Sequence, residues 1–206
     1  MFMKSIQNLC LIQSILMKTD LSNATFIIPI RIESDDRLRN VVTSIAFLVE
    51  NFDTNIIVKE VDKESVFQTE VLPIFEEILE VDLWKNFHHI FERSEEPLFH
   101  RQRVLNEMIA ECETDIVVNY DCDVILPKES YELAYKGIMD NIYDIVYPYG
   151  QGMFQKQVAA TDITVSKFLE TGDYEFLNAV SKDHTSDFGW AQFFKTSVYT
   201  VSYTHL

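Results

Sequence analysis

One stretch decides the expected fold: Ile116-Val117-Val118-Asn119-Tyr120-Asp121-Cys122-Asp123-Val124-Ile125-Leu126-Pro127. Its β-branched apolar start is too short for a helix and follows a polar break at 113–115, which predicts a buried strand. Asp121 and Asp123 then leave the carboxyl end of this strand together. In an open α/β sheet, ligands bind beyond the strand ends, where paired carboxylates can hold a hard divalent cation. Because Asp also bonds its own backbone in ordinary turns, a turn without a metal is the alternative.

Strand and helix patterns alternate on both sides of this stretch. Ser34 is placed to cap the first helix, with Asp35 and Asp36 in the first turn, where the helix dipole favours negative charge. The pattern predicts an α/β fold with a mostly parallel sheet flanked by helices. If the strand order is the common 3-2-1-4, Arg31 after the first strand faces the same crevice as the acidic pair. The predicted strands are 25–29, 55–61, 88–91, 116–120, 144–149 and 187–195, and the predicted helices include 34–48, 65–86, 99–112 and 127–141.

Two arginines open the helix that precedes the decisive strand. Arg101 and Arg103 lie in its first turn, where they oppose the helix dipole unless an anion is bound nearby. Pairing with Glu95, Glu96 or Glu107 on a solvated face is the alternative. Arginine beside a carboxylate-held metal suits a diphosphate, because the metal bridges its oxygens while the guanidinium forks onto them. The residues therefore predict transfer chemistry with a nucleoside diphosphate leaving.

The composition narrows the range of partners. With 206 residues, 47% of them hydrophobic, the chain predicts one globular core. Its 33 acidic and 17 basic residues give a net charge of -16, which argues against a nucleic-acid partner and allows at most peripheral membrane contact. Three cysteines without C-x-x-C spacing suggest neither a disulfide framework nor a zinc site, so a reducing, cytoplasmic location is expected.

Three stretches, taken in order, resemble the donor-site motifs of GT-A fold glycosyltransferases. They are Phe26-Ile27-Ile28-Pro29-Ile30-Arg31, Phe99-His100-Arg101 to Leu105-Asn106, and Tyr120 to Pro127. The closest resemblance is to bacterial family-2-like enzymes related to the β-1,4-galactosyltransferases, and it runs from about Lys18 to about Tyr199. It implies a Rossmann-like GT-A domain over 18–200. Because Met17 leads straight into the first predicted strand, we expect the natural start there and a non-native N-terminal extension within 1–17, and we expect a non-native tail over 201–206.

The resemblance implies a metal-dependent, inverting transfer of a sugar from a nucleotide-diphosphate donor to a saccharide or glycoconjugate acceptor. Mn²⁺ or Mg²⁺ is the implied cofactor, a UDP-sugar is expected ahead of a GDP-sugar, and bacterial polysaccharide biosynthesis is the usual setting. Carried over by position, Pro29 and Arg31 line the nucleotide and Arg101 contacts the diphosphate. Asp123 is the implied direct metal ligand.

Two further acidic residues receive roles from the same resemblance. Asp121 would bind the ribose of the donor, or bind the metal through water. Asp62, at the end of the second predicted strand, is a candidate contact for the nucleobase.

The family pattern breaks off near the end of the chain. The stretch Asp187 to Lys195 resembles the family's Phe-Gly-Gly segment on the acceptor side, with Trp190 in place of the second Gly, where either a sugar-stacking or a core role is open. The motif that supplies the general base and a later metal-binding His are absent, so we expect the base beyond Leu206 and assign no catalytic residue. The last six residues read like a frame of a transposon-based sequencing adapter, so we expect the reading frame to be cut there and leave His205 unassigned.

Two other functions remain open. Asp121-Cys122-Asp123 also resembles the first motif of haloacid-dehalogenase-type phosphatases, in which the first Asp is a nucleophile. That motif normally opens its domain, whereas several strands and helices precede it here. The chain could also be a catalytically inactive nucleotide-sugar-binding fragment. Hydrolysis of a phosphate ester would favour the phosphatase, and donor binding without turnover would favour the fragment.

Overall fold

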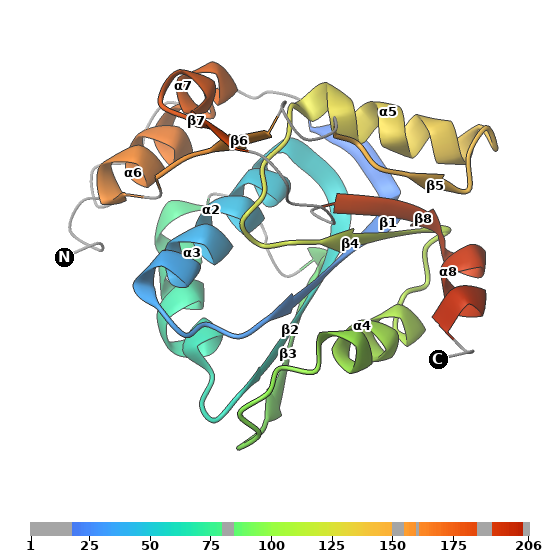
Figure 1. Ribbon diagram of the computed structural model, residues 1–206, viewed down its shortest axis with the longest axis horizontal. Coiled ribbons are helices and arrows are strands. Elements are labelled where there is room, and N and C mark those ends of the chain that lie inside the picture. The colour runs from blue at the N-terminus through green and yellow to red at the C-terminus, as the bar shows by residue number, and fades with distance from the viewer. Residues whose placement is uncertain (1–17, 80–84, 150–154, 160, 185–190, 204–206) are drawn as a thin grey trace.

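The computed structural model describes residues 18–79, 85–149, 155–159, 161–184 and 191–203. Residues 1–17, Trp190 and residues 204–206 of the predicted tail therefore lie outside the described part. The main sheet has six strands in the order β3-β2-β1-β4-β8-β5 (Figure 1). Their bounds are Thr19–Ile30 for β1, Phe52–Asp62 for β2, Phe87–Arg93 for β3, Ile116–Tyr120 for β4, Ile145–Val146 for β5 and Ala191–Lys195 for β8.

The strand directions confirm the predicted fold class. Strands β1 to β4 are parallel to one another in the order 3-2-1-4, while β8 pairs antiparallel with both β4 and β5. Ile27 of β1 lies opposite Asn119 of β4, so the strand ends that lead to Arg31 and Asp121 are neighbours. The sheet is therefore mostly parallel, and its switch point falls beside the acidic pair.

Helices cover both faces of the sheet (Figure 1). One face carries α2 (Asp35–Asn51), the π-helical turn η1 (Phe67–Val71) with α3 (Leu72–Ile78), α5 (Lys128–Met139) and α6 (Asp162–Thr171), and the other carries α4 (Arg101–Ala110) and α8 (Thr196–Tyr203). Successive side chains of β1 alternate between the two cores, with Phe26 and Ile28 in the larger and Ile27 in the smaller. Helix α7 (Tyr174–Ala179) and a two-stranded sheet of β6 (Gln155–Gln157) and β7 (Lys182–His184) complete the described elements.

Several element boundaries differ from the predicted ones. Strand β1 extends back to Thr19, before the predicted start at residue 25. The polar residues Ser22 and Asn23 lie where the register of β1 with β2 shifts, and they interrupt the apolar pattern from which the strand was predicted. The helix predicted over 65–86 ends at Ile78, and the strand predicted over 144–149 is reduced to Ile145–Val146. The predicted cap is confirmed, since the Ser34 side chain accepts a hydrogen bond from the Arg37 backbone. Among the described helices, none combines the length and the apolarity that crossing a membrane requires.

Candidate functional site

The acidic pair lies in a loop at the carboxyl end of β4, and two buried tyrosines hold this loop. The Tyr120 hydroxyl contacts the Val124 carbonyl and lies 2.8 Å from the Tyr131 hydroxyl. Tyr131, which projects from α5, accepts a hydrogen bond of 3.1 Å from the Leu126 backbone N–H. From α2, the Ser44 hydroxyl donates to the Cys122 carbonyl at 2.7 Å. The backbone that carries the two carboxylates is thus fixed from two helices.

We expect Tyr131→Phe to lower the free energy of unfolding by about 1–2 kcal/mol, because the Leu126 N–H loses its buried acceptor. A urea melt followed by circular dichroism measures the change. Tyr143→Phe is the matched control, because Tyr143 is 57% exposed and removal of its hydroxyl should change the free energy of unfolding by no more than about 0.5 kcal/mol. Equal stability of both variants would show that the hydroxyl of Tyr131 does not hold the loop.

Arg101, the first residue of α4, reaches the acidic pair. Its Nη2 contacts Asp121 Oδ1 and lies 3.2 Å from Asn119 Oδ1. Asn119 is buried, and its Nδ2 donates at 3.2 Å to Gln192 of β8, which leaves its oxygen toward Arg101. The structure therefore brings together two of the predicted site residues, Arg101 and Asp121, from separate elements.

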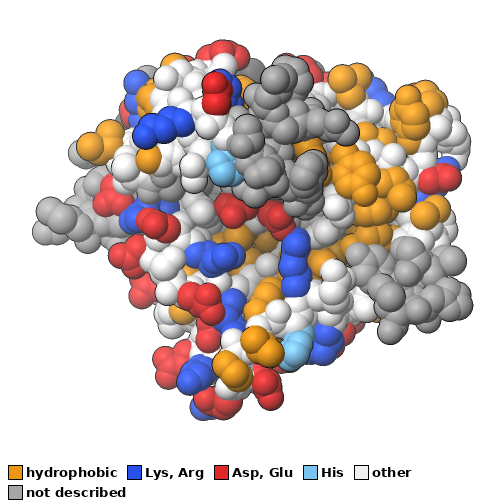
Figure 2. Space-filling model, in the orientation of Figure 1, with side chains coloured by type: hydrophobic (Ala, Val, Ile, Leu, Met, Phe, Trp, Pro, Cys, Tyr) orange, Lys and Arg blue, Asp and Glu red, His pale blue; other side chains and the backbone are white. Residues whose placement is uncertain are grey.

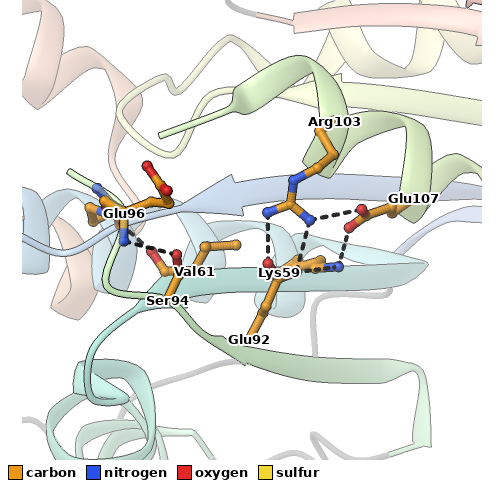
Figure 3. Close-up of polar contacts among 8 residues, drawn as sticks. Lys59, Val61, Glu92, Ser94, Glu96, Arg103 and Glu107 are labelled. Atoms are coloured by element: carbon orange, nitrogen blue, oxygen red, sulfur yellow. Dashed lines mark hydrogen bonds and ion pairs between the residues drawn. The ribbon is translucent and has the colours of Figure 1, made fainter. Parts of the chain in front are cut away.

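Arg103 pairs with glutamates on a solvated face, which is the alternative to anion binding. Figure 3 shows its guanidinium between Glu92 of β3 and Glu107 of α4, at 2.7 and 2.8 Å. Lys59 of β2 joins the same network, 3.1 Å from Glu92 and 2.5 Å from Glu107. The hydrogen bond from Arg103 holds the pKa of Glu92 below its ordinary value, against the effect of burial. This network ties α4 to two strands, which fixes the helix that presents Arg101.

Burial raises the pKa of Asp121 to about 6. The charge of Arg101 opposes this shift, and the neighbouring carboxylate of Asp123 adds to it. Arg37, in the first turn of α2, contributes a further positive charge that favours the ionised carboxylate. Sequence reasoning missed Arg37, although its place three residues after the Ser34 cap put it at the mouth of the predicted crevice. Nearby positive charge thus favours the ionised form of Asp121.

Arg31 lies beyond the end of β1 and is 8% exposed. Its Nε donates to the Val61 carbonyl at 2.9 Å, and its two terminal nitrogens donate to the Glu96 and Pro97 carbonyls at 3.1 Å each. Its guanidinium also lies 5.6 Å from the centre of the Phe99 ring. In this structure Arg31 braces the segment that leads into α4, and its contact with a nucleotide stays a prediction.

The remaining predicted nucleotide contacts lie along the same edge of the sheet. Pro29 is buried in β1, opposite Lys59 of β2. Asp62 ends β2, and its Oδ1 accepts a hydrogen bond of 2.7 Å from the Lys63 backbone. The structure thus gives Pro29 a packing position and Asp62 a local turn contact, and their roles toward a nucleotide stay predictions.

Asp123 is exposed and lies in the wall of a cavity of about 650 Å³. On the face shown in Figure 2, acidic side chains lie beside basic ones near the middle of the molecule. Sequence reasoning missed the cavity, whose signal in α2 was the helical spacing of the polar residues Asn40, Thr43 and Ser44. The lining includes Asn40, Thr43 and Ser44 of α2, Ser130 of α5, and the rings of Tyr149, Phe168 and Tyr174.

The acidic pair suits a hard divalent cation. Carboxylate oxygens are the ligands that Mg²⁺ and Mn²⁺ prefer, and the burial of Asp121 favours a nearby cation. In the described part of the chain, no group of three or more His, Cys, Asp or Glu side chains is placed to hold a metal ion. A cation held here would take Asp123 and Asp121 from the protein, and its other ligands from water or from a bound diphosphate.

Searches with this chain match no protein-family model and no curated protein. Solved structures overlap with it at low identity. S. aureus TarS 1-349 in complex with UDP-GlcNAc has a TM-score of 0.47 and 16% identity, over 87% of this chain and 47% of the TarS chain. A mannosyltransferase from Pyrobaculum calidifontis in complex with GDP-Man and Mn²⁺ has a TM-score of 0.42 and 14% identity, over 60% of this chain and 34% of its own. This chain thus spans about half the length of the TarS structure. The proposed function therefore rests on the residues of this chain and not on the overlap.

Proposed function

We propose that residues 18–200 form the donor-binding part of a metal-dependent, inverting glycosyltransferase of the GT-A type. The observation that carries the proposal is the meeting of Asp121, Asp123 and Arg101 at the switch point of the sheet. A divalent cation on the acidic pair and a guanidinium beside it suit one ligand class, the diphosphate of a nucleotide-sugar.

Each residue has a separate task in this proposal. Asp123, exposed at the cavity wall, binds the cation directly, and Asp121 binds it through water or binds the ribose of the donor. The cation would be Mn²⁺ or Mg²⁺, and it would neutralise charge that builds on the leaving diphosphate. Arg101 donates to the diphosphate oxygens, which places a second positive charge on the same leaving group. The cavity beside Asp123 is large enough for the transferred sugar and the end of an acceptor.

Other details of the proposal come from the motif resemblance. The donor is a UDP-sugar ahead of a GDP-sugar, the acceptor is a saccharide or glycoconjugate, and the setting is polysaccharide biosynthesis in a bacterial cytoplasm. Pro29, Arg31 and Asp62 line the nucleotide, with Arg31 acting chiefly through the backbone that it braces. The general base is assigned to no described residue.

The Arg101–Asp121 ion pair bears on the phosphatase alternative. A nucleophilic carboxylate attacks phosphorus with one oxygen, and Arg101 contacts only Oδ1 of the two carboxylate oxygens of Asp121, so hydrolysis of a phosphate ester is the test of this alternative. An inactive nucleotide-sugar-binding fragment would use the same donor contacts, and turnover of a bound donor distinguishes it from the enzyme.

We expect UDP or GDP to bind in the presence of Mn²⁺, and Asp123→Asn to weaken this binding by about 10- to 100-fold, because the direct metal ligand loses its negative charge. Calorimetric titration of both nucleotides, with and without Mn²⁺, measures the effect. Asp140→Asn is the control, because it removes the same charge from an exposed position at the end of α5. Metal-dependent binding that Asp123→Asn leaves intact would exclude the proposed metal site.

A further inference from the structure

Arg101 already supplies a positive charge at the place where the metal would bind. Its Nη2 contacts Asp121 Oδ1, and both side chains are partly shielded from water, with 39% of Arg101 and 28% of Asp121 exposed. The contact joins the start of α4 to the residue that follows β4. The negative charge of Asp121 is therefore already balanced in this structure by the guanidinium of Arg101.

A second oxygen holds Arg101 in this position. Asn119 Oδ1 lies 3.2 Å from the same Nη2, and Asn119 is itself fixed by its bond to Gln192. Residues 119 and 121 stand two apart along β4 and the residue that follows it, so both acceptors project toward α4. The guanidinium thus sits on two converging oxygens, which gives the pair a definite geometry.

Arg101 lies at the start of α4, where a bound anion would also be favoured. It is the first residue of a helix whose first turn contains no acidic residue and whose His100 cap makes no side-chain hydrogen bond, within the residues that the structure describes. The helix dipole adds positive potential there, so an incoming anion is attracted to the same end. A diphosphate offers Arg101 more negative charge than the single carboxylate of Asp121.

From these contacts we infer that Arg101 takes the place of the metal cation beside Asp121 and thereby couples metal binding to nucleotide binding. Without a nucleotide, Arg101 occupies Asp121 and repels a divalent cation. When a diphosphate binds, Arg101 turns to its oxygens, and Asp121 becomes available to the metal. The metal and the nucleotide therefore strengthen each other's binding by the same factor, as linkage requires. The inference deepens the proposed function and rests on it.

The test uses Mn²⁺ alone as its probe. Electron paramagnetic resonance of free Mn²⁺ gives the metal affinity of the full chain in the absence of nucleotide. We expect Arg101→Gln to bind Mn²⁺ alone at least about 5-fold more tightly than the wild type, because the competing charge is gone. We expect the same variant to bind UDP with Mn²⁺ at least about 10-fold more weakly, because a charged hydrogen bond to the diphosphate is lost.

Two variants separate this mechanism from a general change in charge. Arg103→Gln removes the same charge two residues further along α4, but Arg103 is bonded to Glu92 and Glu107. We expect it to leave the Mn²⁺ affinity within about 2-fold of the wild type, because Lys59 still ties α4 to β2 through Glu107 and because exposed charges are screened. Arg101→Lys keeps the charge and should also bind Mn²⁺ alone like the wild type.

The inference is overturned if Arg101→Gln binds Mn²⁺ alone no more tightly than the wild type, or if Arg103→Gln gains as much. A circular dichroism melt confirms that each variant is folded. The proposed function fails separately, when the wild type shows no binding of UDP or GDP that depends on Mn²⁺. Metal-dependent nucleotide binding with an unchanged Mn²⁺ affinity in Arg101→Gln would keep the proposed function and reject the coupling.

Discussion

We expect Glu60→Ala to lower the free energy of unfolding by about 3–4 kcal/mol, because it removes the shared acceptor of several buried donors. Glu60 lies near the end of β2 and is fully buried. Its carboxylate accepts hydrogen bonds from the Ser65 hydroxyl and from the Phe67 backbone N–H, the latter at 3.0 Å. His89 Nε2 lies 3.4 Å from the same carboxylate. This one side chain therefore ties the start of η1 and strand β3 to β2.

Urea melts of Glu60→Ala, Glu60→Gln and Glu70→Ala test this expectation. Glu70 is an exposed residue of η1, so its loss should change stability by no more than about 0.5 kcal/mol. The amide of Glu60→Gln keeps one acceptor oxygen but offers a donor to the other partner, so we expect an intermediate loss of about 1–2 kcal/mol. A loss in Glu60→Ala that matches Glu70→Ala would mean that water replaces the carboxylate.

The stabilising effect of Glu60 should depend on pH. Burial raises the pKa of Glu60, but the interactions with His89, Ser65 and Phe67 outweigh it and hold the pKa below its ordinary value. A carboxyl group whose pKa is lower in the folded state stabilises above its unfolded pKa of about 4.3, and the effect is lost as the pH falls through the folded pKa. The stability difference between the wild type and Glu60→Ala should therefore shrink below about pH 4.

We expect Phe26→Ala to lower the free energy of unfolding by about 3–5 kcal/mol, through lost burial and a cavity at the centre of the larger core. Phe26 is fully buried in β1. Its ring meets those of Tyr120 and Phe193 edge-on, with centroids 5.5 and 5.9 Å away, and lies 6.2 Å from that of Tyr131. The cavity would open beside the tyrosines that hold the acidic loop.

Chemical denaturation measures this loss, and Leu133→Ala is its control. Leu133 projects from α5 and is 70% exposed, so we expect its truncation to change stability by no more than about 0.5 kcal/mol. If Phe26→Ala cost less than about 1.5 kcal/mol, the surrounding rings would have to collapse into the space. We also expect weaker Mn²⁺-dependent nucleotide binding in Phe26→Ala, measured well below its melting temperature, since Tyr120 and Tyr131 lose a packing partner.

The two arginines of α4 show where sequence reasoning about the site stopped. The helix pattern predicts that each of them meets either an anion or a glutamate, and only the motif resemblance assigns the diphosphate to Arg101 rather than to Arg103. Residues two apart on a helix point to nearly opposite sides, so one can reach β4 while the other meets β3. Which of them faces the crevice depends on how α4 docks, and that docking is fixed by the ion pairs that Arg103 and Lys59 make with Glu92 and Glu107.

Arg31 and Glu60 show a similar limit. The spacing after the first strand predicted that Arg31 would meet an anion, but segment 94–97, from another part of the chain, brings two backbone carbonyls to its guanidinium. Glu60 gave no signal at all, because a single carboxylate in an apolar strand looks like a solvent-facing position. Its partners Ser65 and His89 meet it only after β2 and β3 have paired.

The sequence by itself determined the alternation of strands and helices, the Ser34 cap and the position of Asp121 and Asp123 at a strand end, and it was compatible with the common strand order 3-2-1-4. These features follow from local periodicity, from turn and cap chemistry and from the few topologies that a parallel sheet permits. Only the tertiary structure decided the partners of each charged side chain and the cavity beside Asp123. Those depend on contacts between residues far apart in the chain, which a single sequence does not encode in any local pattern.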